Sequence, residues 1–256
     1  TDSTSYISDE YIKKYDIKLV SLNVIINGVS SREIDIENEV FYEEIKNSKE
    51  IPKSSQPIPE EMLNTFREIV EDGDSIVGIF LSSKMSGTYS NANMIKDMIL
   101  EDYPDAEIHI LDSKTNCMQM GFAVIEAART ASEGKSINEV INAANHVINT
   151  GRFLFTPETL EYLKKGGRIG GAAALFGNVL QIKPILTVVN GETSVFKKVR
   201  TRKKAIEEIV KTVLEEIESK GFGDIVVHHI NCQEDGLKLA KALENKLGKR
   251  VQIQSI

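Results

Sequence analysis

Residues 75–81 and 88–100 do most to limit how this chain can fold. The first stretch, SIVGIFL, is an apolar run whose length and content predict a buried strand. The second, TYSNANMIKDMIL, repeats apolar residues at helical spacing. Open α/β proteins bind ligands where a strand passes through a polar turn into a helix. The two stretches therefore predict an α/β fold with a candidate site in the turn between them.

The turn itself carries side chains suited to an anion. Ser86 can cap the following helix, Gly87 lets a ligand approach the backbone, and Thr88 adds a second hydroxyl. The start of a helix also offers unpaired N–H groups and partial positive charge. A plainer interpretation, in which these residues only cap the helix and form the turn, stays open.

Other strands and helices are expected along the whole chain. Helices are predicted over residues 8–15, 39–48, 59–71, 117–132, 137–149, 160–165, 170–180, 202–220 and 235–247. Strands are predicted over residues 17–26, 107–111, 152–155, 182–189, 193–199, 225–230 and 251–256, and a loop over 51–59. Asn190-Gly191 predicts a hairpin between two of these strands.

Strand and helix alternate through the first part of the chain, which predicts a mainly parallel sheet flanked by helices. The pattern changes near Thr150-Gly151. We therefore expect an N-terminal α/β domain over residues 1–150 and a C-terminal α/β domain with a mixed sheet over 151–256.

Charge and composition narrow the function. A net charge of −7 argues against nucleic acid as a partner. No apolar run approaches the roughly 20 residues that span a bilayer, and no signal peptide is visible at Thr1, which is not an initiator methionine. Two cysteines, Cys117 and Cys232, are too few for a disulfide framework, which fits a cytoplasmic protein. No cysteine or histidine cluster indicates a metal site.

Three hydroxyl-rich turns recur in the first part of the chain: residues 1–5, Ser54-Ser55-Gln56 and Ser86-Gly87-Thr88. The carboxyl edge of a parallel sheet could gather them around one crevice. Neutral hydroxyls can bind a carboxylate by donating hydrogen bonds. The alternative is again that serine and threonine act only as caps and turn formers.

Three further patterns suggest other functions. Residues 164–171 (KKGGRIGG) match neither GxGxxG nor GxxxxGK[ST], so they indicate a helix end and loop, with Arg168 able to reach a ligand or partner. A basic run holds Lys197, Lys198, Arg200, Arg202, Lys203 and Lys204. It indicates either contact with a membrane surface or acidic protein, or simply a solvated face. Finally, Ser86, Asp112 and His229 or His228 could form a hydrolase triad, although Ser86 is not in GxSxG.

Seven segments in chain order form one set: residues 1–4 (TDST), 54–57 (SSQP), 82–90 (SSKMSGTYS), 112–113 (DS), 163–169 (LKKGGRI), 182–186 (IKPIL) and 199–205 (VRTRKKA). Together they resemble the DegV family of bacterial fatty-acid-binding proteins. The resemblance implies two α/β domains that enclose a long-chain fatty acid, such as palmitate, in a tunnel. It also implies no cofactor and no catalysis by the chain itself. Some family members present the carboxyl group of the acid to a separate fatty acid kinase, which performs the chemistry.

The resemblance also implies the site residues. The family's carboxylate-binding hydroxyls fall on Ser54 and Ser86, with Ser55, Gly87, Thr88 and Arg168 as additional pocket or contact residues. The family usually has threonine where Ser54 stands, so the donor is kept and a methyl group is lost. Family members also have an apolar strand before Thr-Asp-Ser and a glycine-rich closing segment with a histidine. Residues 1–256 contain neither, so we expect further residues at both ends, and His229 does not replace that histidine.

A fatty acid needs a long dry tunnel and one polar end. At about 0.8 kcal/mol per buried CH₂, a sixteen-carbon tail contributes on the order of 10 kcal/mol before the costs of binding. Residues 117–124 and 172–180 are candidate tunnel walls, or ordinary core helices. The alternative functions are a serine hydrolase that uses Ser86 and a binding module for a small phosphorylated metabolite at residues 166–171.

Overall fold

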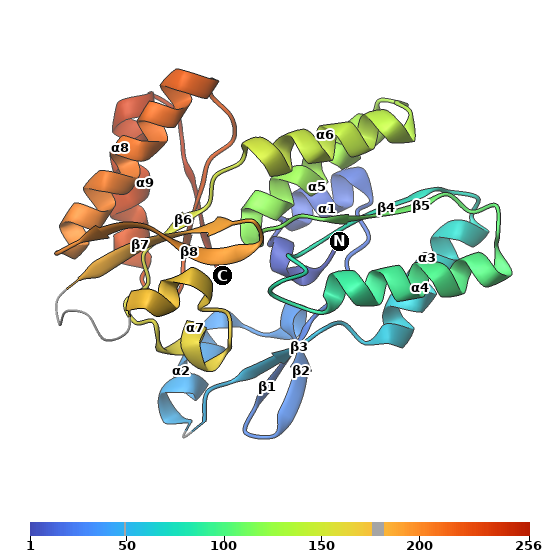
Figure 1. Ribbon diagram of the computed structural model, residues 1–256, viewed down its shortest axis with the longest axis horizontal. Helices are drawn as coiled ribbons and strands as arrows, with labels where there is room; N and C mark the ends of the chain where they lie inside the picture. Colours follow the sequence, from blue (N-terminus) through green and yellow to red (C-terminus); the bar gives the residue numbers. More distant parts are fainter. Residues whose placement is uncertain (49, 176–181) are drawn as a thin grey trace. The chain divides into compact units, whose positions relative to one another are not determined.

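The computed structural model describes residues 1–48, 50–175 and 182–256 (Figure 1). The chain forms two compact units. Unit 1 comprises Thr1–Ile36, Ser48–Phe153 and Val188–Glu192, and unit 2 comprises Glu37–Asn47, Leu154–Thr187 and Thr193–Ile256. The predicted domains, 1–150 and 151–256, stay a prediction. None of the helices in the described residues is both long enough and apolar enough to cross a membrane.

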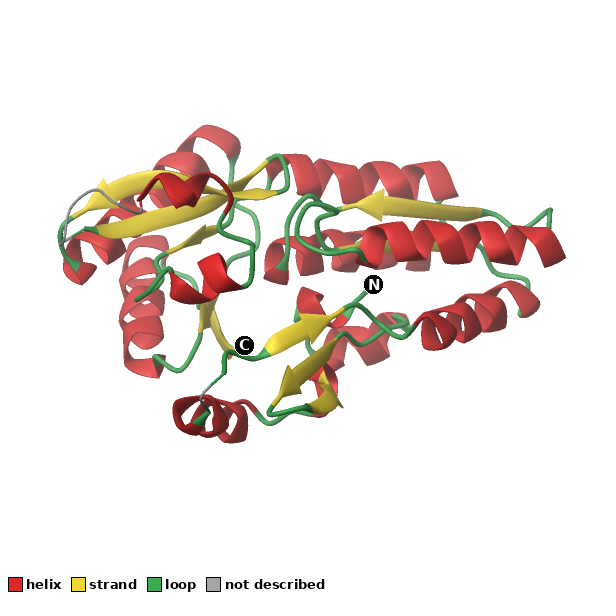
Figure 2. Cartoon of the chain, turned by 60° about the horizontal axis from the view of Figure 1, so that its bottom comes forward, coloured by secondary structure: helices red, strands yellow, loops and turns green. Residues whose placement is uncertain are grey.

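Unit 1 contains the predicted strand–turn–helix. Strand β4 (Ile76–Phe80) pairs in parallel with β5 (Ile108–Asp112), from Ile76 opposite Ile108 to Phe80 opposite Asp112. Helices lie on both faces of this strand pair (Figures 1 and 2). They are α3 (Pro59–Glu71) and α4 (Thr88–Asp102) on one face, and α5 (Cys117–Ser132) and α6 (Ile137–Thr150) on the other.

The core on the α3–α4 side explains why the predicted elements form. Phe80 from β4, Met62 and Phe66 from α3, and Ile95 and Ile99 from α4 are all buried in one cluster. Ile95 and Ile99 are four residues apart, so they share one face of α4. Burying each such side chain contributes about 1.5–3 kcal/mol. This packing fixes α4, and with it the turn that precedes the helix.

A second, antiparallel sheet in unit 1 corrects two predictions. Its strand order is β2-β1-β3, with β1 at Asn23–Ile26, β2 at Val29–Arg32 and β3 at Lys53–Ser55. The predicted single strand over 17–26 is wrong, because its first part only bridges from Val20 to Asp2. The predicted loop over 51–59 contains β3. Both β2 and β3 are short, polar and largely exposed, so no apolar pattern marked them.

Unit 2 contains antiparallel and parallel strands. One sheet has the order β6-β7-β8, formed by β6 (Leu154–Phe155), β7 (Lys183–Val189) and β8 (Glu192–Val199). The other pairs β9 (Val226–His229) in parallel with β10 (Gln252–Ser255). The remaining α-helices of the described chain are α1 (Asp9–Tyr15) in unit 1 and α2 (Asn38–Asn47), α7 (Glu161–Lys165), α8 (Arg202–Lys220) and α9 (Gln233–Leu247) in unit 2.

Alternating side chains of β7 pack on opposite sides of its sheet. Ile185 packs against Ala205 and Ile209, and Ala205 and Ile209 belong to α8. Its neighbour Leu186 packs against Ala172 and Leu175. This alternation is the period of two expected for a strand buried on both faces.

A buried helix was predicted over residues 170–180. In the part that the structure describes, the type of helix differs from an α-helix. Gly170–Leu175 forms a 3₁₀-helix, and residues 176–181 lie outside the described residues. Ala172 and Leu175 are the buried positions of this segment. They are three residues apart, which matches the three-residue turn of a 3₁₀-helix.

Candidate functional site

Ser82 organises the turn between β4 and α4. Its side chain is fully buried, and its Oγ donates to the Gly191 carbonyl at 2.7 Å and accepts from Lys84 N–H at 3.2 Å. Its carbonyl accepts from the N–H groups of Met85 and Ser86 at 2.9 and 3.1 Å. Ser82 thus fixes the backbone up to Ser86. The sequence had indicated a role for Ser86 but none for Ser82.

The tip of the β7–β8 hairpin holds this turn from outside. Asn190 and Gly191 both have positive φ, at 50° and 85°, which is the backbone of the predicted two-residue hairpin turn. A Cβ on Gly191 would lie 2.5 Å from Ser82 Oγ, so only glycine fits there without displacement. Lys84 also forms an ion pair with Glu192 at 3.3 Å. Residues 188–192 accordingly group with unit 1.

Ser86 and Thr88 form a hydroxyl pair at the start of α4. The Thr88 N–H donates to Ser86 Oγ at 3.3 Å, and the two hydroxyl oxygens are 2.9 Å apart. The N-cap residue is Gly87, so the prediction that Ser86 occupies the cap position is wrong by one residue. Ser86 still binds the first N–H of the helix, because its side chain folds forward over Gly87.

Either hydroxyl of this pair can donate to the other. Thr88 is fully buried, whereas Ser86 is partly exposed. In one of the two arrangements the buried Thr88 hydroxyl donates to Ser86 Oγ. Ser86 then accepts twice and keeps its own proton for another acceptor. Together with the partial positive charge of the helix start, this makes Ser86 a donor suited to a carboxylate.

The second hydroxyl-rich turn, Ser54-Ser55-Gln56, approaches the start of α4 through Gln56. Ser54 and Ser55 lie on β3, opposite Val24 and Asn23 of β1, and both are exposed. The following residue, Gln56, places its Oε1 2.9 Å from where a Cβ on Gly87 would stand. A Cβ there would require only that the exposed, flexible end of the Gln56 side chain move, and the Gly87 φ of −75° is open to any residue. The joint role of Ser54 and Ser86 stays a prediction.

The first hydroxyl-rich turn anchors the end of β4. The Asp2 carboxylate is fully buried and accepts from Leu81 N–H at 2.9 Å and from the N–H and hydroxyl of Thr4 at 3.0 and 2.6 Å. Burial raises the pKa of Asp2, and these hydrogen bonds oppose the shift. Ser3 and Tyr6 donate instead to Glu33. Asp2 is a structural residue that the sequence analysis did not single out.

The contacts of the proposed triad residues do not favour hydrolysis. A nucleophilic serine needs a base within hydrogen-bonding reach, but among the described residues Ser86 Oγ is hydrogen-bonded to Thr88. The carboxylate of Asp112 binds the N–H and hydroxyl of Ser83 at 3.2 and 2.6 Å, and the N–H of Lys114 at 2.9 Å. Burial lowers the pKa of His228 to about 4. Asp112 thus serves to fix the turn beside Ser82.

The glycines of residues 164–171 have structural explanations in unit 2. Gly167 follows α7 with a φ of 76°, which ends the helix. A Cβ on Gly170 would lie 2.4 Å from the Thr193 carbonyl, so this glycine allows close packing against β8. Arg168 is exposed and donates to the Gly166 carbonyl. These contacts explain the glycine-rich sequence without a phosphate ligand.

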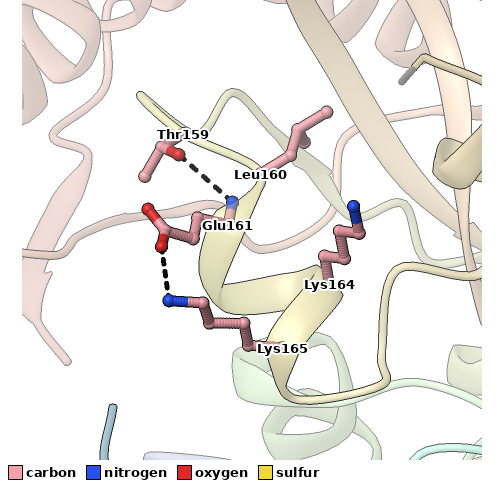
Figure 3. Close-up of a pocket in the computed structure, with 5 residues that line it drawn as sticks. All are labelled: Thr159, Leu160, Glu161, Lys164 and Lys165. Atoms are coloured by element: carbon pink, nitrogen blue, oxygen red, sulfur yellow. Dashed lines mark hydrogen bonds and ion pairs between the residues drawn. The ribbon is translucent and has the colours of Figure 1, made fainter. Parts of the chain in front are cut away.

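A pocket beside α7 is lined by Thr159, Leu160, Glu161, Lys164 and Lys165 (Figure 3). Thr159 Oγ1 accepts from the Glu161 N–H at 3.1 Å, and Glu161 pairs with Lys165 at 2.6 Å. The Lys165 charge is therefore already neutralised, which weakens this pocket as an anion site. It contains none of the predicted site residues.

The basic run is divided in the folded protein. Ion pairs join Lys197 to Glu208, Arg202 to Asp235 and Lys204 to Glu207. The other three cations, Lys198, Arg200 and Lys203, are exposed and form no ion pair with the described residues.

Known proteins resemble this chain over its whole length. A family model described as "Uncharacterised protein, DegV family" matches residues 1–256. The chain belongs to the DegV family. A DegV domain-containing protein of Clostridium acetobutylicum is 54% identical over 246 residues, which cover 96% of this chain and 86% of that protein.

Similar solved structures confirm the α/β fold class. DegV of Bacillus subtilis, described as a fatty acid binding protein, has a TM-score of 0.87 and 33% identity, covering 99% of this chain and 89% of that one. A stearic acid-binding protein from Eubacterium ventriosum has a TM-score of 0.88 and 30% identity, covering 98% and 87%. The resemblance inferred from the sequence segments is thus confirmed as family membership.

Proposed function

We propose that this DegV protein binds a long-chain fatty acid in an apolar tunnel and holds its carboxylate with the hydroxyls of Ser86 and Ser54. The observation that carries the proposal is the Ser86–Thr88 pair at the start of α4, because with Thr88 as the donor Ser86 keeps its own proton for a carboxylate. The fatty-acid-binding descriptions of the Bacillus and Eubacterium proteins support the ligand class.

The proposed ligand divides its interactions between tail and head group. A sixteen-carbon tail supplies on the order of 10 kcal/mol at about 0.8 kcal/mol per buried CH₂, and part of this offsets the costs of binding. The hydroxyls therefore set the orientation of the carboxylate more than the affinity. In this proposal the chain performs no chemistry and needs no cofactor, and a separate fatty acid kinase acts on the presented carboxylate in the bacterial cytoplasm.

Two surface features are proposed for contact with partners. Exposed Arg168 is proposed to meet the kinase. Lys198, Arg200 and Lys203 are proposed to meet the anionic surface of a membrane transiently, since each such cation contributes about 1 kcal/mol near anionic lipid.

The test begins with native mass spectrometry of purified protein and extraction of any bound lipid. We expect a C16–C18 acid in the wild-type protein. Ser86→Ala should fold normally, bind the acid up to roughly tenfold more weakly because one hydrogen bond is lost, and lose most phosphorylation by the kinase. Ser90→Ala is the matched control, since Ser90 is exposed on the same helix.

Unchanged affinity together with unchanged phosphorylation in Ser86→Ala would refute the head-group assignment. Protein that carries no lipid and takes up no added fatty acid would refute the ligand class. Labelling of Ser86 by a fluorophosphonate would instead support the hydrolase alternative.

A further inference from the structure

Asn91 carries a buried donor that no described residue of the chain satisfies. The residue is only 7% exposed, and its Nδ2 is buried with no hydrogen-bond partner among the described residues. Leaving a buried donor unpaired costs free energy, and native proteins rarely do so without a reason. The amide therefore indicates an acceptor that the described part of the chain does not provide.

The position of Asn91 relates this donor to the candidate site. It lies in the first turn of α4, three residues after Thr88, and residues three apart share one face of a helix. Both Thr88 and Asn91 are buried, and the buried positions farther along α4, Ala92, Ile95 and Ile99, are apolar. The polar part of this face is therefore confined to the end beside Ser86.

The missing partner must accept hydrogen bonds and lie near the start of α4. A carboxylate is such a group, because its two oxygens offer about four acceptor positions and no donor. The first turn of the 15-residue helix α4 adds its own positive potential. Ser86 offers one donor and Asn91 offers a second one turn further inside.

We propose that Asn91 is an additional head-group ligand, whose Nδ2 donates to a carboxylate oxygen of the bound fatty acid. This inference rests on the proposed function and adds a residue to its site. Ser86 and Asn91 are both neutral donors, so together they hold the carboxylate by hydrogen bonds without a counter-charge. Asn91 is then a residue that favours acids over lipids with an uncharged head group.

The decisive variant is Asn91→Leu, which replaces the amide with an apolar side chain of similar shape. If the Asn91 amide is unpaired in the lipid-free protein and binds the ligand, this variant should raise the stability of the lipid-free protein. It should also weaken palmitate binding about tenfold or more, as expected for a lost hydrogen bond to a charged group. A purely structural residue would not move affinity and stability in opposite directions.

Asn93→Leu is the matched control on the same helix. Its Nδ2 already donates to the Tyr89 carbonyl at 2.9 Å, so its amide is satisfied within α4. Palmitate affinity in this variant should stay within about twofold of the wild type, because no ligand contact is removed.

A second variant serves if Asn91→Leu does not fold. Asn91→Asp keeps the shape and places a second carboxylate beside the first, so like charges repel. It should weaken palmitate binding much more than hexadecanol binding. An unchanged ratio of the two affinities would overturn the inference.

The outcomes separate this inference from the proposed function. Wild-type protein that binds no fatty acid overturns both. Wild-type protein that binds palmitate, with Asn91→Leu binding equally well, overturns only the role of Asn91. Titration calorimetry of delipidated protein with palmitate measures the affinities, and urea unfolding measures the stabilities.

Discussion

Gly191→Ala should destabilise the protein more than the same change at Gly73. Both glycines have a φ of 85°, so alanine suffers the same backbone strain of about 1–2 kcal/mol at each. Nothing lies within 4 Å of a Cβ on Gly73, whereas a Cβ on Gly191 would lie 2.5 Å from Ser82 Oγ. Gly73→Ala therefore measures strain alone.

The additional effect at Gly191 comes from Ser82. Displacing its hydroxyl breaks the 2.7 Å bond to the Gly191 carbonyl inside a buried site, which costs about 1–3 kcal/mol. We therefore expect a loss of about 2–5 kcal/mol for Gly191→Ala against about 1–2 kcal/mol for Gly73→Ala.

A double-mutant cycle with Ser82→Ala isolates the contact. In the Ser82→Ala protein the hydroxyl is already gone, so Gly191→Ala should cost only the strain. The two changes should thus show a coupling of about 1–3 kcal/mol in free energies of unfolding from urea titration, with unchanged m values. Equal losses at Gly73 and Gly191, or additive effects in the cycle, would show that the hairpin tip does not hold the Ser82 turn.

Two further predictions concern unit 2. Burial lowers the pKa of His228 from 6.5 to about 4, so the folded state binds its proton less tightly than the unfolded state and loses stability as pH falls below 6.5. Between pH 7.5 and 5 the loss from this group is about 2 kcal/mol, and His228→Gln should reduce the pH dependence of urea unfolding by that amount; an unchanged slope would contradict the assignment. Replacing Lys198, Arg200 and Lys203 with alanine should weaken binding to phosphatidylglycerol vesicles on the order of a hundredfold at low salt, and equal binding to phosphatidylcholine vesicles would count against the membrane proposal.

Long helices could be predicted closely from the sequence. Residues 59–71, 117–132 and 202–220 were expected as helices, and α3, α5 and α8 have these bounds. Proline as the first residue of α3 and sustained apolar periodicity supplied the signals. The short strands β2 and β3 were missed because backbone pairing with β1, rather than an apolar pattern, defines them.

The candidate site could be predicted only in part. Ser86, Gly87 and Thr88 were found because a strand, a turn and a helix follow one another in the chain, and local sequence encodes such a unit. Gln56 beside Gly87 had a weaker signal, since it was noted only as the last residue of the hydroxyl-rich turn 54–56 and within the resembling segment 54–57. Nothing local marked Asn91, because a satisfied and an unsatisfied amide look alike in a sequence.

Local sequence thus accounts for the strand, the helix and the hydroxyls at their junction, since apolar periodicity and turn chemistry act over a few residues. The fixing of that junction depends on contacts across long stretches of chain. Asp2 reaches Leu81 across 79 residues, and Ser82 reaches Gly191 across 109. Such contacts form only when packed elements bring a side chain within 3 Å of a backbone group far away in the sequence, and no local preference specifies which groups will meet.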